Sequence, residues 1–220
     1  MRSFVNLFAV ALLLGLSAPV LAAEDPGDTV TGVPLGAPSP EEEAQKQARE
    51  ACKIDICDIL ATKEELGPDI ACDIAWTWQE GEIVDALDDD IDWPWGKLVC
   101  QSTLTLKRAS LAKAMREPRY ELVTDPQTVR CSLHQKEGVP YVVEVKLAPE
   151  VTFKNGAASG AKVKWGQITA PSGIYALLYV GTSLDNSTNV LGPEVVRQIN
   201  KFIRNDCESV KDELPGRRVN

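Results

Sequence analysis

Two adjacent runs of alternating apolar and polar residues, within Thr128–Leu147, constrain the fold more than any other part of the chain. The apolar positions are Val129, Cys131 and Leu133 in the first run, and Tyr141, Val143, Val145 and Leu147 in the second. Period-two alternation is typical of strands with one buried face, and Gly138 in the connection favours an antiparallel hairpin. Pairing Leu133 with Val143, and Cys131 with Val145, would place all these side chains on one face, which then needs a covering layer.

The N-terminal residues indicate export. Arg2 precedes a mostly apolar run from Phe4 to Leu16, and Val20-Leu21-Ala22 offers small residues for cleavage. This run is too short to span a bilayer comfortably, and the segment after it is acidic and rich in proline and glycine. We therefore expect residues 1–22 to be a secretory signal peptide, cleaved near Ala22. The protein would then be secreted to the periplasm, with no transmembrane segment in the mature chain.

The six cysteines predict a disulfide framework. They are Cys52, Cys57, Cys72, Cys100, Cys131 and Cys207. An even number in an exported chain favours disulfide bonds, and metal binding is disfavoured because no CxxC spacing occurs and the chain has a single histidine.

The positions of these cysteines also limit how they pair. We expect Cys207 to bond to Cys52 or Cys57, because that link would join the first and last helices and close a long loop. Two of the three cysteines on expected strands, Cys72, Cys100 and Cys131, should then pair with each other. The third would take the remaining N-terminal cysteine, so that all six are oxidised.

The remaining patterns divide the chain into a leader, one domain and a tail. We expect a flexible Pro/Gly leader at 23–38, a single domain at 39–208 and a frayed tail at 209–220. Ser39 and Pro40 mark the start of a helix. The alternation over 54–59 favours a short strand, with a helical continuation as the alternative. Further strands are expected at 71–78, 97–107, 120–123 and on both sides of Asn155-Gly156.

The C-terminal third contains one ambiguous segment and one clear helix. Residues 174–180 are apolar on every side, which predicts burial but does not separate a strand from a short helix. A helix should begin near Gly192, with an inner stripe that includes Phe202. The expected fold class is therefore α+β: an antiparallel sheet meander with an N-terminal helix and a C-terminal amphipathic helix packed on it, stabilised by disulfides.

The sequence contains no recognisable catalytic constellation. A Ser-His-acid triad would require His134, which falls on the polar face of its expected strand. Ser110-Leu111-Ala112-Lys113 matches the SxxK pattern, but its companion motifs are missing. A non-enzymatic role is favoured, and the enzymatic alternative is a hydrolase that uses carboxylates such as Asp88, Asp90 or Glu144.

An acidic loop followed by two tryptophans is the candidate binding site. Trp93 and Trp95 flank a proline, which limits how both rings can be buried, although core packing of these rings is the favoured reading. The candidate binding residues are Trp93, Trp95, Asp88 and Asp90. Asp88, Asp89, Asp90 and Asp92 form a weak calcium candidate without EF-hand spacing, so neither a metal nor a cofactor is expected.

Charge narrows the possible partners. The chain has 23 basic and 32 acidic residues, a net charge of −9, which disfavours nucleic acid as a partner. We expect an exported, non-enzymatic binding or interaction protein of the periplasm, whose partner is another protein or a small apolar ligand. The alternative within this class is a carrier of a hydrophobic ligand, in a cavity between sheet and helix lined by residues 174–180 and Phe202.

Four segments together carry a resemblance. They are Cys52–Leu60, Trp93–Cys100, Val151–Gly156 and the closing helix that ends at Cys207. They resemble uncharacterised exported, cysteine-containing proteins of alphaproteobacteria. The resemblance implies a periplasmic setting and brings no activity or ligand with it.

Overall fold

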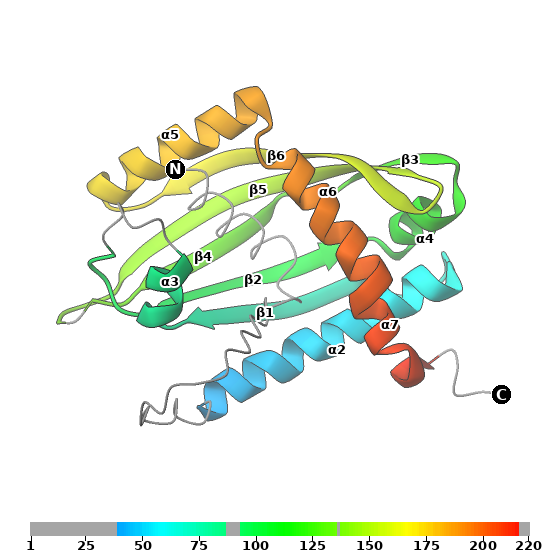
Figure 1. Ribbon diagram of the computed structural model, residues 1–220, viewed down its shortest axis with the longest axis horizontal. Coiled ribbons are helices and arrows are strands. Elements are labelled where there is room, and N and C mark those ends of the chain that lie inside the picture. Colours follow the sequence, from blue (N-terminus) through cyan, green and yellow to red (C-terminus); the bar gives the residue numbers. More distant parts are fainter. Residues whose placement is uncertain (1–38, 87–92, 136, 216–220) are drawn as a thin grey trace, which may run out of the picture.

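The computed structural model describes residues 39–86, 93–135 and 137–215. Figure 1 shows a twisted antiparallel sheet of six strands, with α6 crossing one face and α2 and α5 lying along opposite sides. In chain order the helices and strands are α2 (Pro40–Thr62), β1 (Ile70–Trp78), α3 (Glu80–Ala86), β2 (Leu98–Leu106), α4 (Arg108–Arg116), β3 (Arg119–Val123), β4 (Gln127–Leu133), β5 (Tyr141–Lys154), β6 (Ala157–Thr169), α5 (Ser172–Thr188), α6 (Gly192–Lys201) and α7 (Cys207–Ser209). The predicted α+β class is confirmed.

The long strand β5 organises the sheet. Its first half pairs with β4 and its second half with β3, while β6 pairs along its other edge. Strands β3 and β4 therefore lie end to end beside β5, separated by the irregular segment 124–126. The order continues outward from β4 to β2 and then β1.

The hairpin of β4 and β5 is confirmed, but its predicted register is wrong by two residues. Cys131 pairs with Val143 and Leu133 with Tyr141. Each β4 residue thus pairs with a β5 residue two positions nearer the connection than predicted. Because side chains alternate with period two, a shift of two leaves every side chain on its predicted face.

Helix α2 resolves the ambiguity at residues 54–59 in favour of the helix. The Ser39 Oγ accepts a hydrogen bond from the Glu42 N–H at 3.2 Å, and the Glu42 carboxylate accepts one from the Ser39 N–H at 2.7 Å. This capping box starts the helix. Cys52, Ile56 and Leu60 are buried at helical spacing, which outweighs the local alternation of isoleucine and aspartate.

Residues 174–180 belong to helix α5, and the prediction that they are buried on both faces is wrong. Tyr175, Tyr179, Val180 and Leu184 are all exposed. The helix packs alongside β6 at the edge of the sheet, so only part of its circumference is covered. This segment is apolar on every side because the face of α5 that is exposed to solvent also carries apolar side chains.

Asparagine side chains cover the outer edge of β6. The Asn200 amide accepts from the Ala158 N–H and donates to the Ala158 carbonyl, both at 2.9 Å. Asn186 makes the same pair of bonds with Trp165, both at 3.0 Å. Asn189 donates to the Ala161 carbonyl at 2.9 Å. These amides occupy main-chain groups that would otherwise pair with another strand.

The C-terminal segment packs deeper than predicted. After α6, a π-helical segment, Phe202–Asp206, leads into α7 and a short 3-10 helix, Lys211–Glu213. Val210 and Leu214 are buried, so the core extends into the range for which fraying was expected. Residues 216–220 of that range lie outside the described residues.

Three disulfides connect the layers as predicted. Cys57 bonds to Cys207, Cys52 to Cys72 and Cys100 to Cys131, so none of the six thiols is free. The first bond ties α2 to the C-terminal helix, the second ties α2 to β1, and the third joins directly paired residues of β2 and β4. The alanine-faced helix α2 is therefore held covalently at two points.

Candidate functional site

An apolar cavity of about 130 Å³ lies between the sheet and the helices on its inner face. Helices α2, α4 and α6 contribute to its walls together with the inner faces of β1 to β5. Its lining residues are Ile56, Leu60, Ile74, Ser102, Leu104, Leu106, Leu111, Leu122, Thr124, Gln127, Val129, Leu147, Pro149, Val151, Phe153, Val195, Ile199, Phe202 and Ile203. Only Ser102, Thr124 and Gln127 bring polar side chains to the wall, so the space suits hydrocarbon.

The cavity lies where the sheet divides. The ladder between β2 and β4 ends at the pair Ser102–Val129, after which β2 continues with β1 alone. On the other side β3 continues with β5. We call the opening between the end of β2 and β3 the fork, bounded by residues 103–107 and 122–125. Apolar side chains beside the fork lose part of their cover from neighbouring strands, which leaves room for the cavity.

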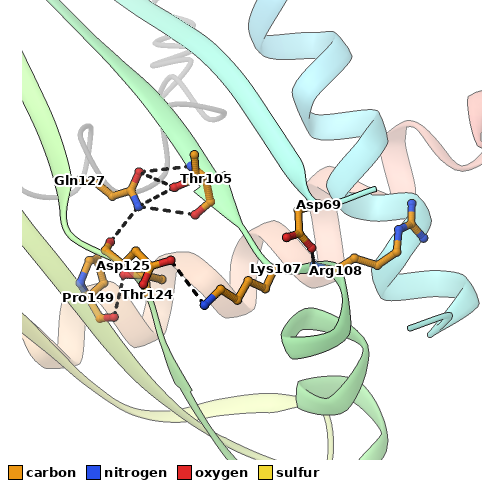
Figure 2. A network of polar contacts seen from close by, with 8 residues as sticks. All are labelled: Asp69, Thr105, Lys107, Arg108, Thr124, Asp125, Gln127 and Pro149. Carbon is orange, nitrogen blue, oxygen red and sulfur yellow. Dashed lines mark hydrogen bonds and ion pairs between the residues drawn. The ribbon is translucent and has the colours of Figure 1, made fainter. Parts of the chain in front are cut away.

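The buried side chain of Gln127 closes the base of the fork. Its Oε1 accepts from the Thr105 N–H at 3.1 Å, and its Nε2 donates to the Asp125 carbonyl at 2.8 Å and to the Thr105 Oγ1 at 2.9 Å. Figure 2 shows the Gln127 amide of β4 beside Thr105 of β2. Gln127 thus bonds to main-chain groups of β2 just beyond the last residue pair of the ladder with β4.

A second space, of about 200 Å³, lies at the fork, and its wall combines apolar side chains with polar and charged ones. Asp69, Lys107, Ser110 and Asp125 contribute polar groups to its wall, and it shares Leu106, Leu122 and Thr124 with the apolar cavity. The Lys107 Nζ lies 3.5 Å from a carboxylate oxygen of Asp125 across the fork, and both side chains are largely exposed. The two spaces therefore meet at common residues, one apolar and one carrying charge.

The predicted aromatic site is partly built into the core. Trp93 is 8% exposed, and its indole N–H donates to the Gly96 carbonyl at 2.9 Å. Trp95 is half-buried, and its ring meets that of Trp93 edge to face at 4.8 Å. The buried position of Trp93 agrees with core packing. Asp88, Asp89, Asp90 and Asp92, the other predicted binding and calcium residues, lie outside the described residues.

Another tryptophan holds the one buried carboxylate in the described ranges. The carboxylate of Asp185, 3% exposed, accepts from the Trp165 indole N–H and from the Leu191 N–H, each at 2.8 Å. Both oxygens are therefore occupied by structural bonds. Asp185 connects α5 and the start of α6 to β6.

The catalytic candidates within the described residues do not assemble, and Asp88 and Asp90 lie outside those residues. His134 follows β4, and its main chain exchanges hydrogen bonds with Gly96 and Lys97. Ser110 and Lys113 lie on α4, and Glu144 faces Arg130 at 3.5 Å on the outer side of the sheet. Asp185 has no second buried carboxylate opposite it in the described part of the chain. The described residues thus give the carboxylate hydrolase hypothesis no pair to act with.

The structure has a cavity between sheet and helix, but its walls differ from those expected for the carrier alternative. Phe202 lines it as predicted, whereas residues 174–180 lie at the edge of the sheet and take no part. The fork residues Lys107, Asp125 and Gln127 were not predicted. The available signal was Asp125-Pro126, a turn pair that interrupts the strand pattern immediately before the hairpin.

Neither a membrane-spanning helix among the described residues nor a known relative helps to assign this site. Within the described ranges, no helix combines the length and apolar character needed to cross a bilayer. Comparison with protein-family models, curated proteins and solved structures gives no match to this chain.

Proposed function

We propose that this chain is an exported, non-enzymatic binding protein that carries a small apolar ligand in the cavity between its sheet and α6. The observation that carries the proposal is the cavity itself, walled almost entirely by aliphatic and aromatic side chains. An apolar space of this kind excludes water, because water entering it would find too few hydrogen-bond partners.

The size of the cavity indicates what it holds. An engineered apolar cavity of roughly 150 Å³ binds benzene. At about 130 Å³, this cavity suits a ring of that size or part of a hydrocarbon chain. The space at the fork extends the site toward the roughly 300 Å³ at which small-molecule pockets begin.

Export to the periplasm is part of the proposal. Three disulfides that tie distant parts of the chain together support an oxidising compartment. N-terminal sequencing of protein from the periplasmic fraction should give a chain that begins near Ala23. A mature protein that retains Met1 in the cytoplasm would contradict this part of the proposal.

Toluene is a suitable first probe because it is uncharged and close to benzene in size. Its binding should raise the melting temperature, since a ligand that binds only the folded state stabilises it. The substitution Leu104→Phe should fill the cavity and weaken toluene binding by at least about tenfold. Ile199→Phe fills the cavity from the opposite wall and should have the same effect, which guards against one variant failing to fold.

The matched control is Leu184→Phe, the same substitution on the exposed surface of α5. This variant should bind toluene as the unmodified protein does. The proposal fails if toluene does not stabilise the unmodified protein, or if both cavity variants still bind it with unchanged affinity.

A further inference from the structure

We propose that the natural ligand is a single-chain amphiphile whose polar head carries no net charge and lies at the fork, with its chain in the apolar cavity. This inference rests on the proposed carrier function and names the class of ligand. A monoacylglycerol is an example of the chemistry, with hydroxyl groups in its head.

The first argument is the continuity of the two spaces. Leu106, Leu122 and Thr124 belong to the walls of both the apolar cavity and the space at the fork. A molecule that fills both passes from an almost wholly apolar wall to one that also carries charged groups. An apolar ligand without a head would make no use of those groups.

The second argument is the width of the apolar space. About 130 Å³ accommodates one ring or one short hydrocarbon chain and not several chains packed together. The larger space at the fork, about 200 Å³, is bounded in part by exposed charged side chains and accepts a head that remains in contact with water. Together these limits favour one chain and one head.

The third argument concerns charge at the fork. Lys107 faces Asp125 at 3.5 Å, and Asp69 accepts a hydrogen bond from the Arg108 N–H at 2.9 Å, as Figure 2 shows. The Arg108 side chain donates to the Pro68 carbonyl. The wall of this space thus carries two carboxylates, Asp69 and Asp125, and one ammonium, Lys107, so a charged head of either sign would meet a like charge there.

The overall charge strengthens the discrimination against anions. At a net charge of −9, the protein repels a fatty-acid carboxylate as it approaches. A hydroxylated head avoids that repulsion and can both donate to carboxylates and accept from the Lys107 ammonium. The fork therefore matches an uncharged polar head better than an acid.

Three amphiphiles with the same short chain test the inference: monohexanoylglycerol, hexanoate and hexyltrimethylammonium, each titrated by calorimetry below its micelle concentration. Monohexanoylglycerol should bind most tightly. Lys107→Ala should weaken hexanoate binding and strengthen hexyltrimethylammonium binding, and Asp125→Ala should do the reverse, each by about two- to fivefold. Toluene affinity should be the same in both variants.

Lys146→Ala and Asp55→Ala are matched controls, because they remove the same charges from exposed positions outside both spaces. The inference is overturned if either charged amphiphile binds as tightly as monohexanoylglycerol, or if the fork variants affect the three amphiphiles no differently from the controls. Toluene separates the two claims: retained toluene binding with either of these results leaves the carrier function standing, whereas absent toluene binding removes both.

Discussion

The carboxamide of Gln127 forms hydrogen bonds with the main chain of Thr105 at the point where β2 ceases to pair with β4. Its Oε1 accepts from the Thr105 N–H at 3.1 Å, and Gln127 is only 7% exposed. A side chain thus satisfies a main-chain donor at the base of the fork. These hydrogen bonds link β4 to β2 beyond the last residue pair of their ladder, beside the cavity.

Replacing Gln127 with leucine should destabilise the protein. The substitution keeps a side chain of similar size but removes every hydrogen bond to Thr105 and Asp125. The expected loss in the free energy of unfolding is about 1–3 kcal/mol, because groups near the base of the fork would lose their partner. Urea denaturation measures the change. Gln101→Leu, on the exposed face of β2, is the control and should shift stability by less than about 0.5 kcal/mol.

The asparagines on the β6 edge predict a residue-specific pattern of hydrogen exchange. Asn200→Ala should speed exchange of the Ala158 amide, and Asn186→Ala should speed exchange of the Trp165 amide, because each amide loses its acceptor. Each variant serves as the control for the other. Equal protection of both amides in both variants would show that the asparagines do not hold the edge.

Asn186 is also the acceptor residue in an Asn-Ser-Thr glycosylation pattern. Its two hydrogen bonds to Trp165 oppose modification of the folded protein.

The three disulfides should contribute unequally to stability. Cys57 and Cys207 are 150 residues apart in sequence, compared with 31 for Cys100–Cys131 and 20 for Cys52–Cys72. A longer closed loop restricts the unfolded chain more, so loss of Cys57–Cys207 should exceed either other loss by about 1–2 kcal/mol. Paired serine substitutions and denaturation without reductant measure the order. An equal effect from all three pairs would contradict the loop-length argument.

Glu194 should give α6 a small dependence on pH. Burial raises the pKa of Glu194, but hydrogen bonds from Arg197 and Gln198 outweigh this effect and hold the pKa below its ordinary value. A lowered carboxyl pKa contributes stability above the unfolded value, roughly 4.3, and this contribution is lost as pH falls through the folded value.

Glu194→Gln should therefore reduce stability at neutral pH and have little effect in acid. The neutral-pH loss should be about 0.5 kcal/mol, because the Arg197 side chain is 69% exposed and solvent screens the pair. Urea titrations of both proteins at neutral and acidic pH make the comparison. A difference that persists unchanged in acid would show that the carboxylate charge is not its source.

Local patterns predicted the strands and the covalent links well. Alternation located β1, β2 and the β4–β5 hairpin, and the placement of cysteines on helices and strands limited the disulfide pairings to a small set that includes the observed one. Both depend on which face a residue occupies, and that information is local. The register of the hairpin depends in addition on the path of its connection, which alternation alone does not determine.

The errors arose where long-range packing decides the outcome. Residues 54–59 alternate like a strand, yet the buried stripe of Cys52, Ile56 and Leu60 makes them helical. Residues 174–180 gave no sign that Tyr179 and Val180 face solvent, because the pattern contains no polar face. The fork could not be predicted, since it depends on where the β2–β4 ladder ends and on Gln127 reaching Thr105.

Methyl NMR of protein labelled at isoleucine, leucine and valine, titrated with monohexanoylglycerol, tests the central claim most directly. The internal cavity and the exposed side of α5 are two apolar surfaces in the described part of the chain that could receive a ligand. The account predicts chemical-shift changes centred on Leu104, Leu122 and Ile199, which line the cavity from β2, β3 and α6. Changes centred on Val180 and Leu184, with the cavity methyls unmoved, would contradict it.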